Sequence, residues 1–216
     1  MTQFKGIIFD MDGTLVDSEI IWHHAEAELF AARNIPYTDD IREHIIGMRV
    51  DEMFIKLVDM LNLDHAPQEL EAELVKRMLE KIPTMVKPKS GAQAIIEWTA
   101  AQNIPYCIAS SSPLSIIEST VNAQGWDDLI PHLYSADDVP KGKPAPDVYL
   151  YAAEKLGVNP SECLALEDSP NGAKSAIAAG MTCYVVPDSH SKPEAFAAIT
   201  AHVYSSLDDI LAKLKN

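Results

Sequence analysis

The sequence predicts an α/β fold, a Rossmann-like parallel sheet core with helices on both faces plus an inserted all-α cap. Short apolar runs recur along the chain with amphipathic segments between them, whereas the stretch from about Glu19 to about Ile82 shows helical periodicity and no convincing strand. The chain has 216 residues, 47% hydrophobic and 23% charged. This composition is typical of a globular protein with one core domain and a smaller insertion.

Four apolar runs predict buried strands, because they are short and apolar on both faces. They lie at residues 6–9, 106–109, 163–166 and 183–186. Helical patterns separate the later runs, at residues 93–101, 114–124, 148–156 and 172–179. Gly157 and Gly180 follow two of these segments where helix C-caps are expected. Strands that alternate with helices predict a parallel sheet covered on both faces.

The helical stretch contains four periodic segments, at residues 22–33, 39–46, 53–63 and 69–82. We interpret them as an insertion between the first and second strands of the core, with Lys87-Pro88-Lys89 marking the return to the core. We therefore expect a core formed by residues 1–17 and 84–216, and a helical cap formed by residues 18–83.

The formal net charge of −15 at pH 7 repels nucleic acid and anionic membranes, so neither is an expected partner. An anionic substrate is repelled as well, so a phosphate site must bring its own positive charge. The three cysteines, Cys107, Cys163 and Cys183, lie in apolar runs and predict buried, reduced thiols. No signal-peptide pattern and no membrane-spanning apolar stretch is found. We expect a cytoplasmic monomer.

The first strand is followed by two carboxylates, Asp10 and Asp12, one residue apart. A carboxylate can attack phosphorus and form an acyl phosphate, and a second acid can protonate the leaving oxygen and later deprotonate water. Gly13 allows the turn that would bring both into one cleft. The alternative is a plain β-hairpin, since Asp-Gly is a strong turn signal. The two interpretations have equal weight for this cluster alone.

The second strand is followed by three serines and Pro113. A hydroxyl and backbone N–H groups at a strand end can hold a phosphate oxygen. We assign the phosphate contact to Ser110, with Ser111 beside it, and the N-cap of the next helix to Ser112. Farther along, Lys143 lies on a stiff loop between a glycine and a proline. Most such lysines are solvated, but this one could offset the repulsion between a phosphate dianion and carboxylates.

The third apolar run is followed by the adjacent acids Glu167 and Asp168. Together with Asp10 and Asp12 they could bind Mg²⁺, which prefers carboxylate oxygens and water. The alternative is structural: Ser169 caps a helix, and the negative charge of Asp168 interacts favourably with the dipole at the N-terminus of that helix. All four clusters follow strands, and in an open parallel sheet the carboxyl ends of the strands meet at one edge. We therefore expect the four clusters to form one site.

These clusters resemble the four motifs of the haloacid dehalogenase superfamily, over essentially the whole chain. The motifs read Asp10-Met-Asp-Gly-Thr-Leu-Val-Asp-Ser-Glu19, Ala109-Ser110, Lys143-Pro-Ala-Pro-Asp147 and Leu166-Glu-Asp-Ser-Pro-Asn-Gly172. Their order and spacing are similar to the branch with a helical cap after the first motif, which includes β-phosphoglucomutases and sugar-phosphate phosphatases. The resemblance implies a phosphatase that forms an aspartyl-phosphate on Asp10. Dehalogenases and phosphonatases lack an acid at the position of Asp12, so its presence implies phosphate-ester chemistry.

The resemblance also implies roles for the other motif residues. Asp12 would be the general acid/base, with its backbone carbonyl on the metal. Ser110 and Lys143 would bind the phosphoryl group, and Lys143 would also neutralise Asp10. The Mg²⁺ cofactor would be held by Asp10, Asp12 and Asp168, with Glu167 contributing directly or through water.

The expected cap would select the substrate, a small phosphate ester, and close over it to exclude water. Candidate contacts are His23, His24, Arg49 and Lys76, although each is also typical of a solvated helix residue. Trp22 stands where β-phosphoglucomutases have a histidine, and the segment from Asp17 to Trp22 resembles hexose- and hexitol-phosphate phosphatases. Hydrolysis of a sugar or sugar-alcohol phosphate is therefore the leading hypothesis. The alternatives are a β-phosphoglucomutase-like phosphomutase and a non-catalytic phospholigand-binding protein.

Overall fold

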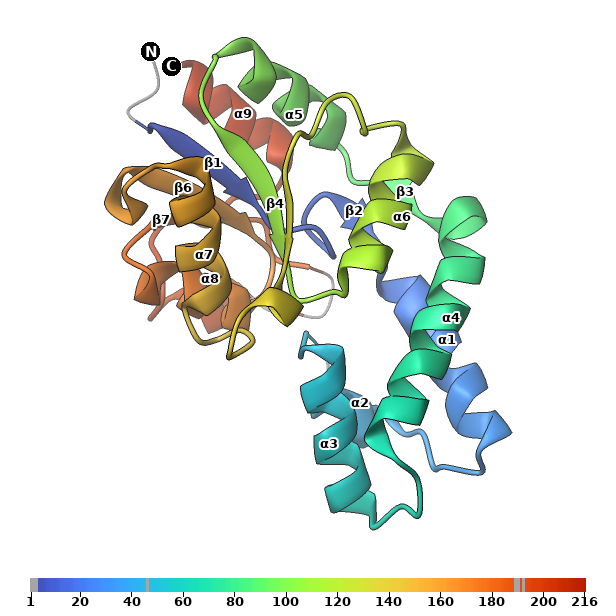
Figure 1. The fold of residues 1–216 in the computed structure, drawn as a ribbon. Helices are drawn as coiled ribbons and strands as arrows, with labels where there is room; N and C mark the ends of the chain where they lie inside the picture. The colour runs from blue at the N-terminus through green and yellow to red at the C-terminus, as the bar shows by residue number, and fades with distance from the viewer. Residues whose placement is uncertain (1–3, 46, 189–190, 192) are drawn as a thin grey trace.

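The core of the computed structural model is a five-stranded parallel sheet with the strand order β5-β4-β1-β6-β7 (Figure 1). The structure describes residues 4–45, 47–188, 191 and 193–216. The strands are β1 (Gly6–Phe9), β4 (Tyr106–Ser110), β5 (Leu133–Ser135), β6 (Cys163–Glu167) and β7 (Thr182–Val185). The four predicted strands are confirmed, and the edge strand β5 is an addition to them.

Helices cover both faces of this sheet, as predicted (Figure 1). Ile7 and Phe9 of β1 belong to the apolar cluster on one face, and Ile8 belongs to the cluster on the other. The first face is covered by α5 (Ala92–Ala101), α6 (Leu114–Gln124) and α9 (Leu207–Lys215), and the second by α7 (Asp147–Leu156) and α8 (Pro170–Ala178). This alternation follows from the two-residue period of a strand. Since helices cover both faces, polar side chains can gather at the carboxyl ends of the strands.

Three short 3₁₀ helices, η1 (Ala136–Asp138), η2 (Pro160–Glu162) and η3 (Pro193–Phe196), lie in the loops of the core. The three cysteines are buried and unpaired, as predicted. Among the described residues, no helix combines the length and the apolar character needed to cross a bilayer.

The helical insertion, residues 19–85, consists of α1 (Glu19–Ala32), α2 (Asp39–Glu43), α3 (Val50–Leu61) and α4 (Pro67–Met85). It is flanked by two short strands, β2 (Val16–Asp17) and β3 (Lys87–Pro88), which pair antiparallel. Val16 lies opposite Pro88 and Asp17 opposite Lys87. The chain therefore leaves the core and returns to it through adjacent strands.

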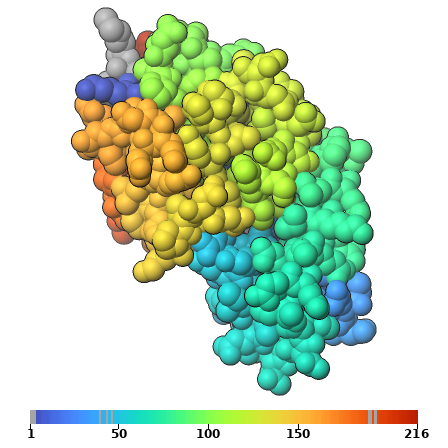
Figure 2. All heavy atoms as spheres, viewed as in Figure 1, coloured from blue at the N-terminus to red at the C-terminus, as the bar shows by residue number. Residues whose placement is uncertain are grey.

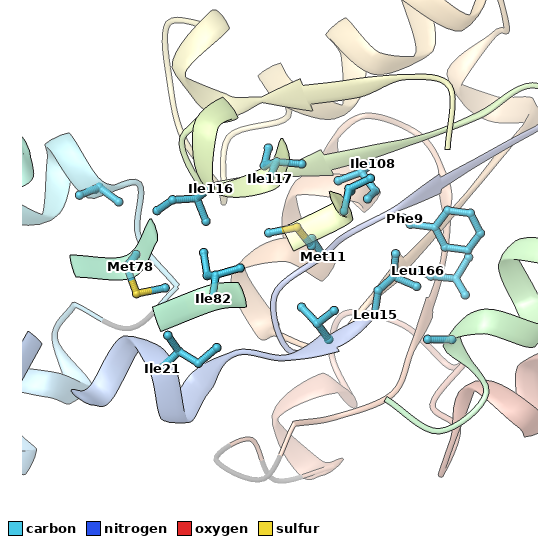
Figure 3. Packing of buried hydrophobic residues seen from close by; sticks show 14 of the residues in the cluster. Phe9, Met11, Leu15, Ile21, Met78, Ile82, Ile108, Ile116, Ile117 and Leu166 are labelled. Atoms are coloured by element: carbon cyan, nitrogen blue, oxygen red, sulfur yellow. The ribbon is translucent and has the colours of Figure 1, made fainter. Parts of the chain in front are cut away.

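One apolar cluster runs from the core into the helical insertion (Figure 3). Met11 and Leu15, which follow β1, belong to the same cluster as Ile21 of α1, Ile82 of α4 and Ile116 of α6, and all five are fully or almost fully buried. In the space-filling view the insertion, in teal and blue, lies directly against the yellow part of the core (Figure 2). Buried apolar surface at this junction stabilises the contact by about 25 cal/mol per Å².

Candidate active site

A cavity of about 690 Å³ lies beyond the carboxyl ends of the core strands, between the core and the helical insertion. Its walls combine the residues that follow β1, β4 and β6, the loop that carries Lys143, and side chains of α1, α2 and α3. The core residues lining it are Asp10, Asp12, Ser110, Ser111, Ser112, Lys143, Asp168, Ser169, Pro170, Asn171, Asp188 and Ser191. The insertion contributes Glu19, Trp22, Glu26, Arg42, Ile45, Gly47, Met48, Val50 and Met53. The four clusters singled out from the sequence are thus brought to one place.

The turn after β1 brings the first and last clusters together. The backbone N–H of Gly13 donates to the carbonyl of Val16, and Gly13 has a φ of 80°. A Cβ atom at this glycine would lie 2.0 Å from Oδ2 of Asp168, so only glycine permits the close approach. Because β1 is paired on both edges, by β4 and β6, it cannot pair with β2, and the plain hairpin alternative is wrong.

Lys143 is the positive centre of the site. It is 6% exposed, and its Nζ lies 2.6 Å from Oδ1 of Asp10 and 2.7 Å from Oε1 of Glu167. The hydroxyl of Tyr149, on α7, donates to the same oxygen of Glu167 at 2.6 Å. A buried charge is tolerated when it is paired and hydrogen-bonded, so the contacts with the two carboxylates allow this lysine to be buried.

Burial sets the protonation equilibria of these groups. It raises the pKa of Asp10 to about 7, although the neighbouring Lys143 lowers that pKa. Burial also raises the pKa of Asp168 well above its usual range, and the charges of Asp10 and Glu167 add to this effect. For Lys143, burial alone would lower the pKa, but the two carboxylates beside it raise the pKa above its ordinary value. The site therefore holds more carboxylates than one ammonium can neutralise.

The donor set fits a hard divalent cation. Asp10, Glu167 and Asp168 are all buried, and each offers a carboxylate oxygen within 4.8 Å of the others. Thr14 donates to Oδ1 of Asp168 at 3.1 Å and so orients this carboxylate. Both oxygens of Glu167 already accept hydrogen bonds, Oε1 from Lys143 and Oε2 from the backbone N–H of Asp168 at 3.2 Å. Glu167 is thus positioned to orient Lys143 as well as to face a cation.

The start of α8 packs tightly against Glu167. Ser169 accepts a hydrogen bond from the backbone N–H of Gly172, so the predicted N-cap is present. A Cβ atom at Gly172 would lie 1.9 Å from Oε1 of Glu167. The structural and the ligand-binding interpretations of this cluster are therefore compatible.

Asp12 accepts four side-chain hydrogen bonds. Ser18 and Trp22 donate to Oδ1 at 2.6 and 3.2 Å, and Ser110 and Ser112 donate to Oδ2 at 3.2 and 2.7 Å. The prediction that Ser112 caps α6 is wrong. The N-cap position belongs to Pro113 and has no side-chain cap, because the Ser112 hydroxyl is used by Asp12.

Among the serines at the end of β4, one hydroxyl has no hydrogen-bond partner in the described part of the chain. Ser110 is fully buried and its Oγ also accepts from the backbone N–H of Ser112. Ser111 lines the cavity, and its buried Oγ has no hydrogen-bond partner among the residues that the structure describes. A buried hydroxyl beside a cavity favours a polar ligand that completes its hydrogen bonding.

The structure does not bring Arg49, Lys76 or His23 to the cavity wall. Arg49 is bound by Asp51 and donates to the carbonyls of Ala136 and Val139 in the core, at 3.0 and 2.9 Å. Lys76 is exposed on α4, and His23 lies on the exposed side of α1.

Other residues of the insertion occupy that wall instead. Glu19, Trp22 and Glu26 lie on one face of α1, and Arg42 of α2 lies beside them. Their spacing of three and four residues is the signal that would have found them, because residues so spaced share a helix face. Tyr149 carried no such signal, since its role depends on contact with a strand far away in the sequence.

A model of the haloacid dehalogenase-like hydrolase family matches residues 4–180 of the chain. Hexitol phosphatase B of Escherichia coli (strain K12) is 32% identical over 217 residues, which cover 98% of this chain and 96% of the relative. The probable pseudouridine-5'-phosphatase of Drosophila melanogaster is 32% identical over 214 residues, covering 94% and 89% of the two chains. Both relatives match nearly end to end.

Among solved structures, CbbY from Rhodobacter sphaeroides in complex with phosphate superimposes with a TM-score of 0.87. It is 24% identical and covers 99% of this chain and 100% of that chain. At this identity the similarity concerns the fold, and it includes the helical insertion as well as the sheet.

Proposed function

Since the chain belongs to the haloacid dehalogenase-like hydrolases, we propose that it is a magnesium-dependent phosphatase that hydrolyses a sugar or sugar-alcohol phosphate through an aspartyl-phosphate on Asp10. The observation that carries this proposal is the buried contact of Asp10 with Lys143 at 2.6 Å, beside a second acid, Asp12, held by four hydrogen bonds. The hexitol phosphatase similarity supports the substrate class.

In the first step a carboxylate oxygen of Asp10 attacks phosphorus and the ester bond to the leaving oxygen breaks. Asp12 gives its proton to that oxygen, so the alcohol leaves neutral. In the second step Asp12 takes a proton from water, which attacks the aspartyl-phosphate and releases inorganic phosphate and free Asp10. Ser110, Ser111 and Lys143 bind the phosphoryl oxygens during both steps.

Asp10, Asp168, the backbone carbonyl of Asp12 and, directly or through water, Glu167 would hold Mg²⁺. The bound ion supplies positive charge that offsets the repulsion between the phosphoryl group and the carboxylates. The helical insertion would act as the cap that excludes water from the site.

The proposal predicts that Asp10→Asn lowers kcat by at least about 10³-fold while the fold is retained, because an amide is a poor nucleophile. Phosphate release from a panel of sugar, sugar-alcohol and nucleotide phosphates, with Mg²⁺ and then with a chelator, measures this loss. Release confined to a few sugar or sugar-alcohol phosphates and abolished by chelator would support the assignment.

An Asp10→Asn variant with near-normal Mg²⁺-dependent activity would rule out the covalent mechanism. No release from any ester, combined with isomerisation of a hexose 1-phosphate, would indicate a phosphomutase instead. Circular dichroism of the variant shows whether the fold is intact.

A further inference from the structure

The wall that the helical insertion contributes to the cavity combines apolar residues with three ionisable ones, Glu19, Glu26 and Arg42. Arg42 donates from Nη2 to Oε2 of Glu19 at 2.7 Å, and its side chain is 15% exposed. Glu26 lies on the same face of α1 and also lines the cavity. The positive charge of Arg42 is therefore already offset before any ligand enters.

Two groups in this wall keep unused hydrogen-bonding capacity. Glu26 is 7% exposed and accepts at Oε2 from the hydroxyl of Tyr37 at 2.5 Å, while Oε1 has no hydrogen bond to any described residue. Arg42 donates from Nη2 to Glu19, and its buried Nε has no hydrogen-bond partner within the described part of the chain. Buried polar groups are rarely left in this state, so the wall is complementary to a ligand with both donors and acceptors.

Hydroxyl groups meet this requirement, since each can donate to the Glu26 carboxylate and accept from the Arg42 guanidinium. A second phosphate does not. Glu19 and Glu26 both line the cavity, and Arg42 is the cation that the described part of the insertion places there. A second dianion at this wall would face carboxylates for which the described residues of the insertion hold no spare positive charge.

We infer that Glu26 and Arg42 bind hydroxyl groups at the non-phosphorylated end of the substrate, and that the substrate carries one phosphate only. This inference rests on the proposed phosphatase function and assigns the specificity-determining residues of its site. It also distinguishes this site from one built for a sugar bisphosphate, in which a free cation opposite the nucleophile is required to bind the second phosphate.

The test uses the full chain with Mg²⁺ and compares kcat/KM for sorbitol 6-phosphate, which is rich in hydroxyls, with kcat/KM for 4-nitrophenyl phosphate, which has none. Glu26→Leu and Arg42→Met should each lower the ratio of the two constants by about 10- to 100-fold, the effect of losing one hydrogen bond to a charged group. Glu26→Gln should restore part of the ratio. Glu28→Gln, on the exposed side of α1, is the matched control and should leave the ratio unchanged.

A second comparison sets fructose 6-phosphate against fructose 1,6-bisphosphate for the unmodified protein, and the monophosphate should be preferred by at least about 10-fold. Equal losses on both substrates of the first comparison would overturn the assignment of Glu26 and Arg42. Equal or better turnover of the bisphosphate would overturn the single-phosphate inference. Failure of the unmodified protein to release phosphate even from 4-nitrophenyl phosphate would instead refute the phosphatase function on which both rest.

Discussion

Gly172 has no side chain, and this lets the carboxylate of Glu167 lie against the first turn of α8. A Cβ atom there would lie 1.9 Å from Oε1 of Glu167, the oxygen that binds Lys143 and Tyr149. One methyl group would therefore displace Glu167, which fixes the position of Lys143 beside Asp10. The geometry of the contact between Lys143 and Asp10 thus depends on a residue that has no polar side chain of its own.

We predict that Gly172→Ala lowers kcat/KM by about 10²-fold, because misplacing catalytic groups by about 1 Å has effects of this size. It should also lower the free energy of unfolding by about 1–3 kcal/mol through overpacking. Gly125→Ala is the control: a Cβ there meets nothing within 4 Å, although its φ of 67° adds some strain. It should lose stability but keep wild-type kcat/KM. An active Gly172→Ala variant would contradict the argument.

Among the elements, the start of α3 is where the helical insertion is tied to the core by polar contacts. Arg49 donates to the carbonyls of Ala136 and Val139, and Glu52 accepts from the backbone N–H of Gly142 at 3.1 Å. The core partners in these bonds lie around η1 and in the loop that leads to Lys143. One of these contacts is therefore made directly beside Lys143.

Arg49→Ala should therefore weaken the contact between insertion and core, and we expect amide hydrogen exchange at residues 136–142 to become about 10-fold faster. KM should rise, because the cavity wall that the insertion contributes is held less firmly against the core. Arg33→Ala removes an ion pair with Glu73 that lies entirely within the insertion and serves as the control. Unchanged exchange at residues 136–142 in Arg49→Ala would show that the contacts of Arg49 do not hold the insertion against the core.

On α1, the buried carboxyl of Glu26 makes stability depend on pH. Burial raises its pKa from 4.5 to about 7, against the opposing hydrogen bond from Tyr37. Between these two values the folded protein keeps a proton that the unfolded chain releases, so the free energy of unfolding falls as pH rises, by up to about 3 kcal/mol. Glu26→Gln should remove this loss and be more stable than wild type at pH 8, but not at pH 4.

Urea unfolding of both proteins at the two pH values measures the difference. Glu28→Gln is the control, because Glu28 is exposed and ion-paired with Lys81. A Glu26→Gln variant with the same pH dependence as wild type would show that Glu26 does not retain its proton in the folded state.

For the molecule as a whole, the sequence predicted the core better than the wall of its cavity. Buried parallel strands are apolar on both faces and therefore conspicuous, whereas β5 has three residues of which Leu133 and Tyr134 are only partly buried. The motif residues were found because strand ends converge in any parallel sheet. No comparable rule predicts which residues of the helical insertion reach the cavity. Arg49 and Lys76 were chosen because they lie near the substrate loop and a cap lysine of similar enzymes. Which helix face meets the cavity, however, depends on packing that the sequence does not show.

Helices α1 to α4 also lie between two neighbouring strands, because Val16 and Pro88 are directly paired. The gap that would remain if these helices were deleted is thus the distance between adjacent strands, about 5 Å, which a short turn can bridge. The insertion is therefore an exchangeable module: another segment grafted at the same two points would leave the register of the central sheet untouched. Such an exchange would replace the part of the cavity wall that α1, α2 and α3 contribute, while the residues at the ends of β1, β4 and β6 would keep their places.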